Sequence, residues 1–366
     1  MFKEDYSKYY LLEKFNIFCK NYSSGQRSLF IGSISFEKRC LNVFKIICNY
    51  PYLYDQIKFL LYKVKRHTGP DFKEMDKNLE FNLREYLNIN LIKHKNIKVN
   101  EYDIFDKNKN LIGYDIVRKD FEEIDEPFEN VFFDISSFPR SVFFPIIKIL
   151  VSNNLLKNIY ILWTEKKGLK NERNVLNYAQ KNKIPLFPKP VNNRNSHFFY
   201  LPVLGYDNTP IKKLFLENFF DIYTNKYFYP ITTFPSRWPE ETDNILIQHL
   251  DFFTEGFTNE IKDIFDLSNL IFVPSNNPFE LYLKIKKFKE NKMKVYDNCS
   301  IALSPFGTKA QSLGVCLSSI LLDLSILYYN PEFYKLSEAE KSTVSKYEDL
   351  VGETYIALIK GDLYEV

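Results

Sequence analysis

Short apolar runs alternate along the chain with longer stretches in which apolar residues recur every three or four positions. The short runs predict buried strands, and the longer spacing predicts helices that bury one face. The predicted strands cover residues 28–34, 97–103, 130–135, 158–163, 197–204, 222–229, 270–273, 300–303 and 354–359. The predicted helices cover residues 6–20, 41–48, 55–66, 78–87, 140–150, 171–182, 210–220, 240–253, 278–290 and a segment that begins at residue 308. This alternation predicts an α/β fold that is Rossmann-like and doubly wound, with mostly parallel sheets in two lobes.

The alternation of strands and helices starts again after residue 205. We therefore predict an N-terminal Rossmann-like lobe over residues 1–205 and a C-terminal Rossmann-like lobe over residues 206–366. The chain of 366 residues is longer than one average domain. The sequence leaves open whether the two lobes are separate domains or parts of one continuous sheet.

The composition favours a folded chain without a general affinity for nucleic acid. Hydrophobic residues make up 45% of the chain, which is enough for a sizeable core. The formal net charge is +3, whereas a protein that coats nucleic acid normally has a stronger basic excess. The 34 phenylalanines and 26 tyrosines are spread along the whole chain, so their number alone marks no functional site.

Cysteine usage and the N-terminal residues indicate a cytoplasmic protein. The five cysteines are an odd number without CxxC spacing, which suits a reducing compartment where they act as small core residues. The N-terminal residues lack the basic and apolar regions of a signal peptide. No uncharged apolar run reaches the roughly 18 residues needed to span a bilayer, so we expect no membrane association.

Several enzyme and cofactor motifs are absent from the sequence. It contains no GxGxxG after the first strand, no GxxxxGK[ST], no HExxH and no GxSxG. Its four histidines are isolated from one another and from the cysteines, which argues against a metal site. We therefore predict neither a cofactor nor a metal, and catalytic residues stay unassigned.

The turn over residues 304–309 is the strongest candidate for a binding site, because it joins a strand to a helix. Open α/β sheets bind ligands at the carboxyl ends of their strands, where helix N-termini offer N–H groups to anions. Gly307 permits a tight turn, Thr308 can cap the helix, and Lys309 is unfavourable in a first helical turn unless an anion is nearby. The alternative is an ordinary capped helix with a solvated lysine. The candidate phosphate-binding residues of this turn are Ser304, Gly307, Thr308, Lys309 and Gln311.

A resemblance to a known family rests on Ser304-Pro305-Phe306-Gly307-Thr308-Lys309, followed by Gly314. This run resembles the glycine-threonine-lysine turn of CARF- and SAVED-type Rossmann-like domains, whose fuller motif has a second glycine where this chain has Phe306. Such domains sense cyclic or linear oligonucleotides in prokaryotic antiviral defence, usually as homodimers. The resemblance implies a nucleotide or oligonucleotide ligand and a ribose or base contact at Asp134. Alternatively, the Asp134 carboxylate accepts backbone N–H groups of its own turn.

Three strand-to-helix junctions, at residues 34–39, 136–140 and 304–309, share one pattern. Each has a small hydroxyl residue where the strand ends, a phenylalanine soon after, and a cation in the first helical turn. If all three lie at one sheet edge, their hydroxyl, N–H and cationic groups form a single positive crevice for phosphate oxygens. Chance similarity between helix caps and duplication of a βα unit are the alternatives. The candidate residues of the other two junctions are Ser35, Arg39, Ser136, Ser137 and Arg140.

The proline-rich loop over residues 230–239 is a further candidate. Arg237 can hold an anion while the neighbouring indole of Trp238 stacks on a base. The alternative is a rigid connector in which Trp238 fills the core. Residues 205–207 and 274–277 also follow strands, and they are either specificity contacts or ordinary turns.

Three functional hypotheses follow from these patterns. The first is a nucleotide- or oligonucleotide-binding component of a prokaryotic defence system that signals to a partner protein, with a homodimer as one form. The second is an enzyme that acts on a nucleotide or phosphosugar, with Lys309, Arg140 and Asp134 as electrostatic groups. The third is a structural subunit. Ligand binding separates the first two from the third, and turnover separates the second from the first.

Overall fold

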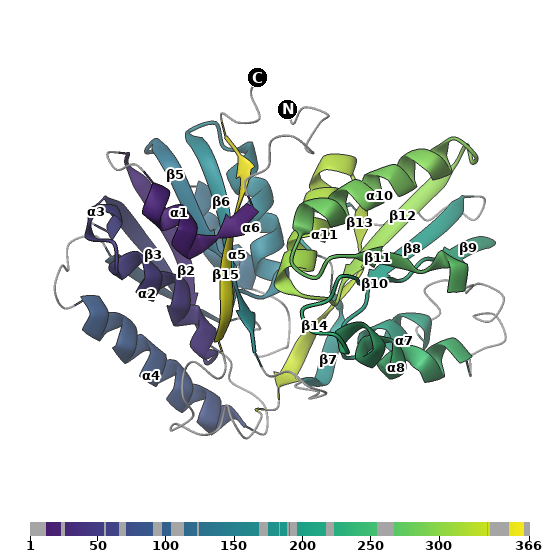
Figure 1. Ribbon diagram of the computed structural model, residues 1–366, viewed down its shortest axis with the longest axis horizontal. Helices are drawn as coiled ribbons and strands as arrows, with labels where there is room; N and C mark the ends of the chain where they lie inside the picture. Colours follow the sequence, from purple (N-terminus) through teal and green to yellow (C-terminus); the bar gives the residue numbers. More distant parts are fainter. Residues whose placement is uncertain are drawn as a thin grey trace. The chain divides into compact units, whose positions relative to one another are not determined.

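The computed structural model describes residues 12–22, 26–54, 56–65, 71–90, 97–103, 113–122, 124–167, 175–182, 184–188, 190, 196–216, 223–254, 267–334, 336 and 351–361. The chain forms two compact units. Unit 1 comprises Met1–Lys170 and Glu332–Val366, and unit 2 comprises Asn171–Pro331. Each unit contains its own sheet, with helices on both faces (Figure 1).

Unit 1 is built around a seven-stranded sheet. Across the sheet the strands are β1 (Leu12–Lys14), β15 (Val351–Lys360), β6 (Leu156–Lys166), β5 (Phe128–Asp134), β2 (Ser28–Ile34), β3 (Ile57–Lys65) and β4 (Ile97–Asp103). The five strands from β6 to β4 are parallel. β15 pairs antiparallel with both β6 and β1, so the end of the chain completes a sheet that its first half begins.

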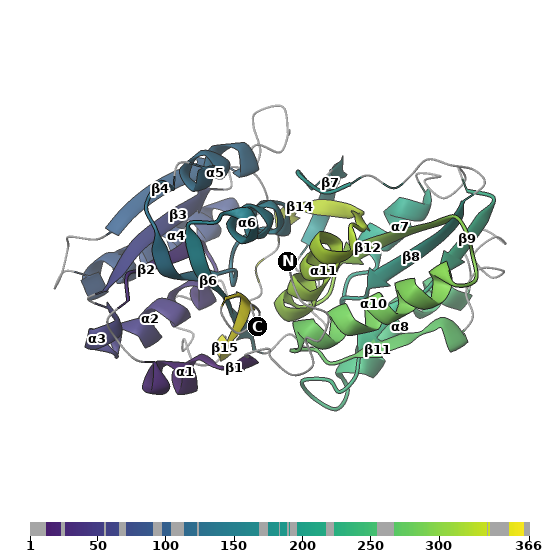
Figure 2. The same ribbon diagram turned by 90° about the horizontal axis from the view of Figure 1, so that it is seen from above.

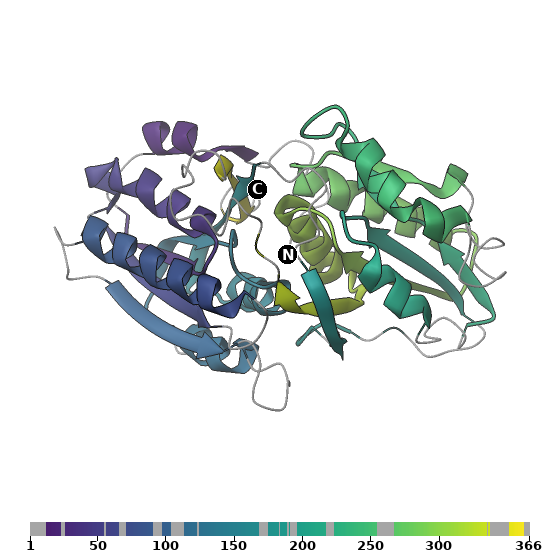
Figure 3. The same ribbon diagram turned by 90° about the horizontal axis from the view of Figure 1, so that it is seen from below.

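The helices of unit 1 cover both faces of this sheet (Figures 2 and 3). One face carries α1 (Phe15–Asn21), the 3-10 turn η2 (Lys38–Leu41), α2 (Asn42–Cys48), α3 (Pro51–Tyr54) and α4 (Phe72–Asn90). The other face carries α5 (Gly113–Glu122) and α6 (Arg140–Ser152). Phe30, Phe44, Phe132 and Tyr86 belong to the core between the sheet and the first set of helices.

Unit 2 contains a six-stranded, all-parallel sheet. Its order is β11 (Ile271–Val273), β10 (Ile231–Thr233), β8 (His197–Val203), β12 (Cys299–Pro305) and β13 (Ser325–Ile326), with β9 (Asn225–Phe228) beside the first half of β8. α7 (Thr209–Leu216) and α8 (Glu241–Thr254) lie on one face, and α10 (Pro278–Met293) and α11 (Lys309–Leu322) lie on the other (Figure 1). A 3-10 turn, η4 (Leu267–Asn269), precedes β11, and β7 (Val175–Asn182) pairs with β14 (Tyr328–Tyr334) in a separate two-stranded sheet.

The two units share one strand order. When the five main parallel strands of each unit are numbered along the chain, both sheets read 3-2-1-4-5. In such a sheet the first and fourth strands are neighbours, but the chain leaves them toward opposite faces. This topological switch point is where open α/β sheets bind ligands. It lies between β2 and β5 in unit 1 and between β8 and β12 in unit 2.

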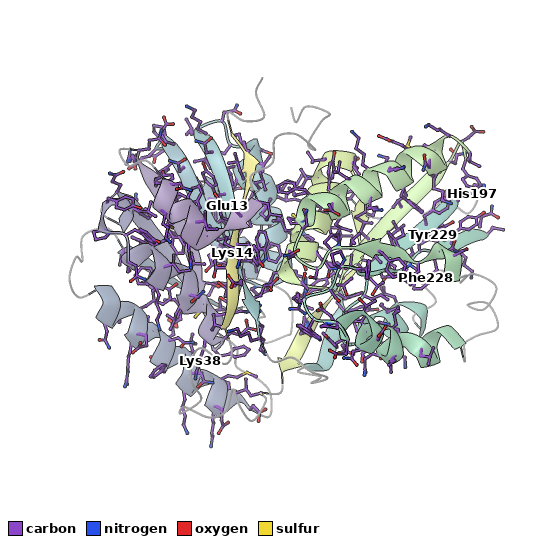
Figure 4. All side chains as sticks on the ribbon, viewed as in Figure 1. Glu13, Lys14, Lys38, His197, Phe228 and Tyr229 are labelled. Carbon is purple, nitrogen blue, oxygen red and sulfur yellow. The ribbon has the colours of Figure 1, made fainter. Side chains whose placement is uncertain are left out.

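An aromatic cluster occupies the amino end of β8. The His197 ring lies 4.2 Å from the Tyr296 ring, and Lys292 Nζ donates to Tyr229 Oη at 2.7 Å. The same ammonium group lies over the rings of Phe199 and Phe288. Figure 4 labels His197, Phe228 and Tyr229 in this region. These aromatic residues therefore pack the end of β8 that is opposite to its switch point.

The Rossmann-like, doubly wound α/β prediction is confirmed, and the two main sheets are separate. Two predicted helices are wrong: residues 57–65 form strand β3, and residues 175–182 form strand β7. Residues 6–11 and 171–174, which belong to two predicted helices, lie outside the described residues. The division of the chain also differs from the predicted boundary after residue 205, because β15 pairs with β6 and returns the C-terminal segment to unit 1.

Candidate functional site

The unit 1 edge, defined as residues 35–39 and 135–140, contains two of the three predicted junctions. Its two loops follow β2 and β5, the strands on either side of the switch point. The hydroxyl oxygens of Ser33 and Ser137 are 2.5 Å apart, and Ser137 Oγ also donates to Ser33 O at 3.1 Å. These bonds join the two loops, so the structure brings the Ser35 and Ser136 junctions together.

A buried hydrogen-bond chain runs inward from this edge. Asp134 Oδ1 accepts from Ser136 N at 2.9 Å and from Ser136 Oγ at 2.5 Å. Ser136 Oγ accepts in turn from Thr164 N on β6 at 2.8 Å. Asp134 is 2% exposed and Ser136 is fully buried. Asp134 therefore accepts backbone and hydroxyl protons of its own turn, as one of the two sequence interpretations expects.

One cation of the unit 1 edge, Arg39, is paired with a carboxylate. Arg39 Nε donates to Glu37 Oε2 at 2.6 Å, and Glu37 N donates to Ser35 Oγ at 3.1 Å. Figure 4 labels Lys38 at the end of β2, where burial and the nearby Lys45 lower the pKa of its ammonium group. Burial raises the pKa of the neighbouring Cys40 thiol to about 12, so this cysteine is not a nucleophile at neutral pH.

The unit 2 edge consists of residues 205–207, 234–238, 275–277 and 306–309, which follow β8, β10, β11 and β12. Phe306 N donates to Val203 O at 3.1 Å and holds the last loop against β8. A Cβ atom on Gly205 would lie 2.2 Å from Phe306 O, and one on Gly307 would lie 2.2 Å from Gln311 Oε1. Gly205 is needed because the loops after the first and fourth strands approach each other too closely for a side chain, whereas Gly307 leaves room for the Gln311 side chain of the following helix.

The N-terminus of α11 is closed by a capping box. Thr308 Oγ1 accepts from Gln311 N at 3.2 Å, and Gln311 Oε1 accepts from Thr308 N at 3.0 Å. Thr308 Oγ1 also donates to Ser275 O at 2.7 Å, which fixes the loop after β11. The threonine hydroxyl and the glutamine carbonyl therefore bind the protein itself. Lys309 lies in the first turn of α11, and the amide NH2 of Gln311 has no hydrogen-bond partner among the described residues.

Replacing Thr308 with alanine is expected to lower the free energy of unfolding of unit 2 by about 1–2 kcal/mol, because a helix cap and the bond to Ser275 are lost. Thr308→Ser retains the hydroxyl and should remain within about 0.5 kcal/mol of the parent. Trp163 in unit 1 and Trp238 in unit 2 are the two tryptophans of the chain. Denaturant titration of a Trp163→Phe background therefore reports on unit 2 through Trp238. Equal stability of the alanine and serine variants would contradict the capping role.

Ser304 takes a different place from the one the sequence predicts. It is fully buried, donates to Leu327 O at 2.6 Å and accepts from Tyr200 Oη at 2.8 Å. Its hydroxyl thus joins β12 to β8 and to the segment after β13, inside the sheet. This arrangement corrects the expectation that Ser304 contacts a phosphate, because both of its hydrogen-bond partners are groups of the protein.

Arg237 is held by a buried carboxylate. Its backbone N donates to Glu241 Oε2 at 2.7 Å, and its Nε donates to Glu241 Oε1 at 2.8 Å. The Glu241 side chain is fully buried and the Arg237 side chain is 14% exposed. The guanidinium carbon lies 4.5 Å from the Trp238 ring centroid, and the Trp238 ring is within 13° of parallel to that of Tyr206. Arg237 is therefore paired with Glu241 and packs on the Trp238 ring. It is not an unpaired cation that is free to bind an anion.

Several buried polar atoms of unit 2 have no hydrogen-bond partner among the described residues. At this edge they are Tyr206 Oη, Trp238 Nε1 and Gln311 Nε2, together with Thr232 Oγ1 in β10. Burial and the nearby Glu241 raise the pKa of Tyr206 to about 12, against the opposing effect of Arg237, so the phenol keeps its proton at neutral pH. These groups are donors without an acceptor in the described part of unit 2, and such atoms are uncommon in folded proteins.

The three junctions do not lie at one sheet edge, which was the condition for a single crevice. Ser35, Arg39, Ser136, Ser137 and Arg140 belong to the sheet of unit 1, whereas the turn over residues 304–309 belongs to that of unit 2. Lys309 therefore borders a different sheet from Arg140 and Asp134. Each unit instead has a candidate site of its own, at the same topological position.

Sequence reasoning missed two residues that shape these edges. Glu241 stands four residues after Arg237, a spacing that suggests an ion pair on a helix and that offered a usable signal. Asn82 lies in α4 and donates from Nδ2 to Ser35 O at 2.8 Å, and nothing in its local sequence indicates this contact. Tyr206, in contrast, falls within a segment that the sequence marks as a candidate.

No family model matches the chain, and no curated protein matches it in sequence. Within the described ranges, no helix is long and apolar enough to cross a membrane. No group of three or more histidine, cysteine, aspartate and glutamate side chains in that part of the chain is arranged to hold a metal ion.

Proposed function

We propose that the protein binds a nucleotide or oligonucleotide at the unit 2 edge. The observation that carries the proposal is the set of unused donors on Tyr206, Trp238 and Gln311, which lie on segments that follow neighbouring strands at a switch point. A buried donor without a partner costs about 1–3 kcal/mol, and a ligand that accepts from it recovers this free energy. The position agrees with the general location of ligands in doubly wound sheets.

The chemistry of the edge suits a ligand that combines a planar base with phosphate. Lys309 and the first turn of α11 supply positive charge for a phosphate group. Gln311 Nε2 and Trp238 Nε1 are donors for oxygen or ring nitrogen acceptors. The rings of Tyr206 and Trp238 provide apolar faces for a base.

The role of the bound ligand follows from the resemblance to CARF- and SAVED-type domains. On that basis we propose that the ligand is a signal of prokaryotic antiviral defence and that binding is passed to a protein partner, with homodimer formation as part of the response. Hydrogen-bond donors without a partner at a switch point support ligand binding, and they are equally consistent with a sensor and with an enzyme. Assays of ligand turnover separate these two roles.

Nucleotides, dinucleotides and cyclic oligonucleotides are expected to raise the melting temperature of the purified protein, and one class should do so most strongly. A ligand at 100 times its Kd adds about 2.7 kcal/mol of stability. Lys309→Ala should remove most of the shift because the phosphate loses its cation. Gln311→Glu keeps the carbonyl oxygen of the capping box but turns the spare NH2 donor into an anion, so it should abolish binding.

Thr308→Ser serves as the matched control, because it preserves both the helix cap and every unused donor. The parent and this variant should bind alike. Quenching or enhancement of Trp238 fluorescence in the Trp163→Phe background places the ligand in unit 2. If no nucleotide class stabilises the parent protein, or if the shift persists unchanged in Lys309→Ala and Gln311→Glu, the proposal is wrong.

A further inference from the structure

The unit 1 edge has the topological position of a ligand site, but the proposal above does not use it. Its loops follow the first and fourth parallel strands of the sheet, as those of the unit 2 edge do. Its chemistry is different, because hydroxyl groups and an amide replace the aromatic pair. Two buried side-chain atoms near this edge, Ser141 Oγ and Asn82 Oδ1, have no hydrogen-bond partner among the described residues.

The N-terminus of α6 differs from that of α11. The residue before α6 is Pro139, and no side chain caps this helix, whereas a capping box closes α11. Arg140 lies in the first turn of α6. The next residue, Ser141, is fully buried, and its Oγ has no hydrogen-bond partner in the described part of the chain. The uncapped N–H groups, a cation and an unused hydroxyl together favour an anion at this point.

A second unused group lies beside the loop after β2. Asn82 is 1% exposed, and its Nδ2 donates to Ser35 O at 2.8 Å. The other end of the amide, Oδ1, has no partner among the described residues. Since the two amide atoms share one carbon, Oδ1 must lie near the same loop. It is an acceptor that a hydroxyl or amine donor can satisfy.

We propose that unit 1 binds a phosphorylated sugar at this edge. The phosphate lies at the N-terminus of α6 beside Arg140 and Ser141, and a sugar hydroxyl donates to Asn82 Oδ1. A free sugar phosphate and the ribose phosphate of a nucleotide can both make these phosphate and hydroxyl contacts. This site is independent of the one proposed in unit 2.

The charges of the edge agree with a phosphate monoester. Lys38, Arg39 and Arg140 are its cations, and Glu37 and Asp134 are its carboxylates. Glu37 pairs with Arg39, while Asp134 accepts from Ser136 N and Oγ within its own turn. The cations outnumber the carboxylates, which together with the helix N-terminus favours the binding of a phosphate group.

Binding is measured by calorimetry on the full chain and by Trp163 fluorescence in a Trp238→Phe background. Trp163 is 1% exposed, and the next residue, Thr164, donates its N–H to Ser136 Oγ, so the indole reports on this edge. The probes are ribose 5-phosphate, AMP, ribose and inorganic phosphate. Ribose 5-phosphate should bind more tightly than ribose or inorganic phosphate. If ribose 5-phosphate binds more tightly than AMP, the natural ligand is a free sugar phosphate. If AMP binds more tightly, the ligand is a nucleotide.

Arg140→Gln is expected to weaken the binding of ribose 5-phosphate at least tenfold, because a charge-assisted contact to phosphate is lost. Asn82→Ala should weaken it about fivefold, the effect of one hydrogen bond. Ser141→Ala breaks no hydrogen bond to the described residues, so it should fold normally and still bind the phosphate probes several times more weakly. Asn78→Ala, one turn earlier in α4, is the control and should bind as the parent does.

Absence of binding for all four probes at millimolar concentration would overturn the proposal. Equal affinity for inorganic phosphate and ribose 5-phosphate, or unchanged affinity in both Arg140→Gln and Ser141→Ala, would do the same. These readouts use Trp163 and residues of unit 1. They therefore succeed or fail separately from the Trp238, Lys309 and Gln311 tests of unit 2.

Discussion

Replacing Glu241 with alanine is expected to lower the free energy of unfolding of unit 2 by about 3–5 kcal/mol. The Glu241 carboxylate is fully buried and accepts from both the backbone N and the guanidinium of Arg237. Its removal leaves a mostly buried cation without a counter-charge. It also frees the loop that holds Trp238 against Tyr206. Denaturant titration followed by Trp238 fluorescence in the Trp163→Phe background measures the loss.

Two controls test whether the loss comes from the unpaired charge. The double variant Arg237→Met with Glu241→Leu replaces both partners with apolar groups and should be more stable than Glu241→Ala alone. Arg118 and Glu122 form an exposed pair at the same spacing in α5, and Glu122→Ala should change stability by less than about 0.5 kcal/mol. A loss below about 1 kcal/mol for Glu241→Ala would show that the buried pair does not stabilise unit 2.

Gly205→Ala is expected to destabilise unit 2 by about 3 kcal/mol. It should also lower the affinity of any ligand that binds at the unit 2 edge. The new Cβ would lie 2.2 Å from Phe306 O and 3.0 Å from Phe306 C. Both are backbone atoms, so no rotation of a side chain relieves the overlap. The loops after β8 and β12 must move apart, and Lys309 shifts with the second loop. Melting temperature and nucleotide affinity measured on one preparation test both effects.

Gly113→Ala provides the contrast in unit 1. The nearest atom to its new Cβ is a ring carbon of Tyr102 at 3.0 Å, and an aromatic ring can turn aside. Since alanine also favours the helix that begins there, the change should stay within about 1 kcal/mol. If Gly205→Ala and Gly113→Ala lower the free energy of unfolding by similar amounts, the close approach of the unit 2 loops is not the reason that Gly205 is required.

Local sequence patterns were sufficient for most of the two sheets. The buried strands β2, β5, β8 and β12 are short apolar runs bounded by turn residues, and the structure places them close to the predicted ranges. β3 was predicted as a helix because a parallel strand buried on both faces lacks the alternation of apolar and polar residues. Its apolar positions, interrupted by Lys58 and Lys63, fit a helical spacing equally well.

The division into units depends on pairing that no local pattern contains. The apolar residues of β15 predict a strand correctly, but they do not indicate that its neighbours are β6 and β1. A boundary placed where the alternation restarts therefore assigns the C-terminal strand to the wrong unit. Long-range pairing of this kind depends on the register and shape of the complete sheet.

For the candidate sites, the sequence predicts positions better than roles. The junctions at Ser35, Ser136 and Thr308 do follow parallel strands, because hydroxyl residues at strand ends and helix caps have local causes. Their partners come from distant segments: Asn82 from α4, Ser275 from the loop after β11, and Leu327 from the segment after β13. Whether a hydroxyl faces a ligand or another strand depends on those partners.

The antiparallel pairing of β15 with β6 also affects how the protein is synthesised. The ribosome completes β6 at Lys166 and reaches the end of β15 at Lys360 after roughly 190 further residues, which takes about 10–40 s at ordinary rates of translation. During that interval the hydrogen-bonding groups of β6 that later pair with β15 have no strand to meet, while all of unit 2 emerges and can fold. An unpaired strand edge is prone to association with other chains. Newly made unit 1 is therefore most vulnerable to aggregation before its last strand arrives, and slow translation of unit 2 prolongs that exposure.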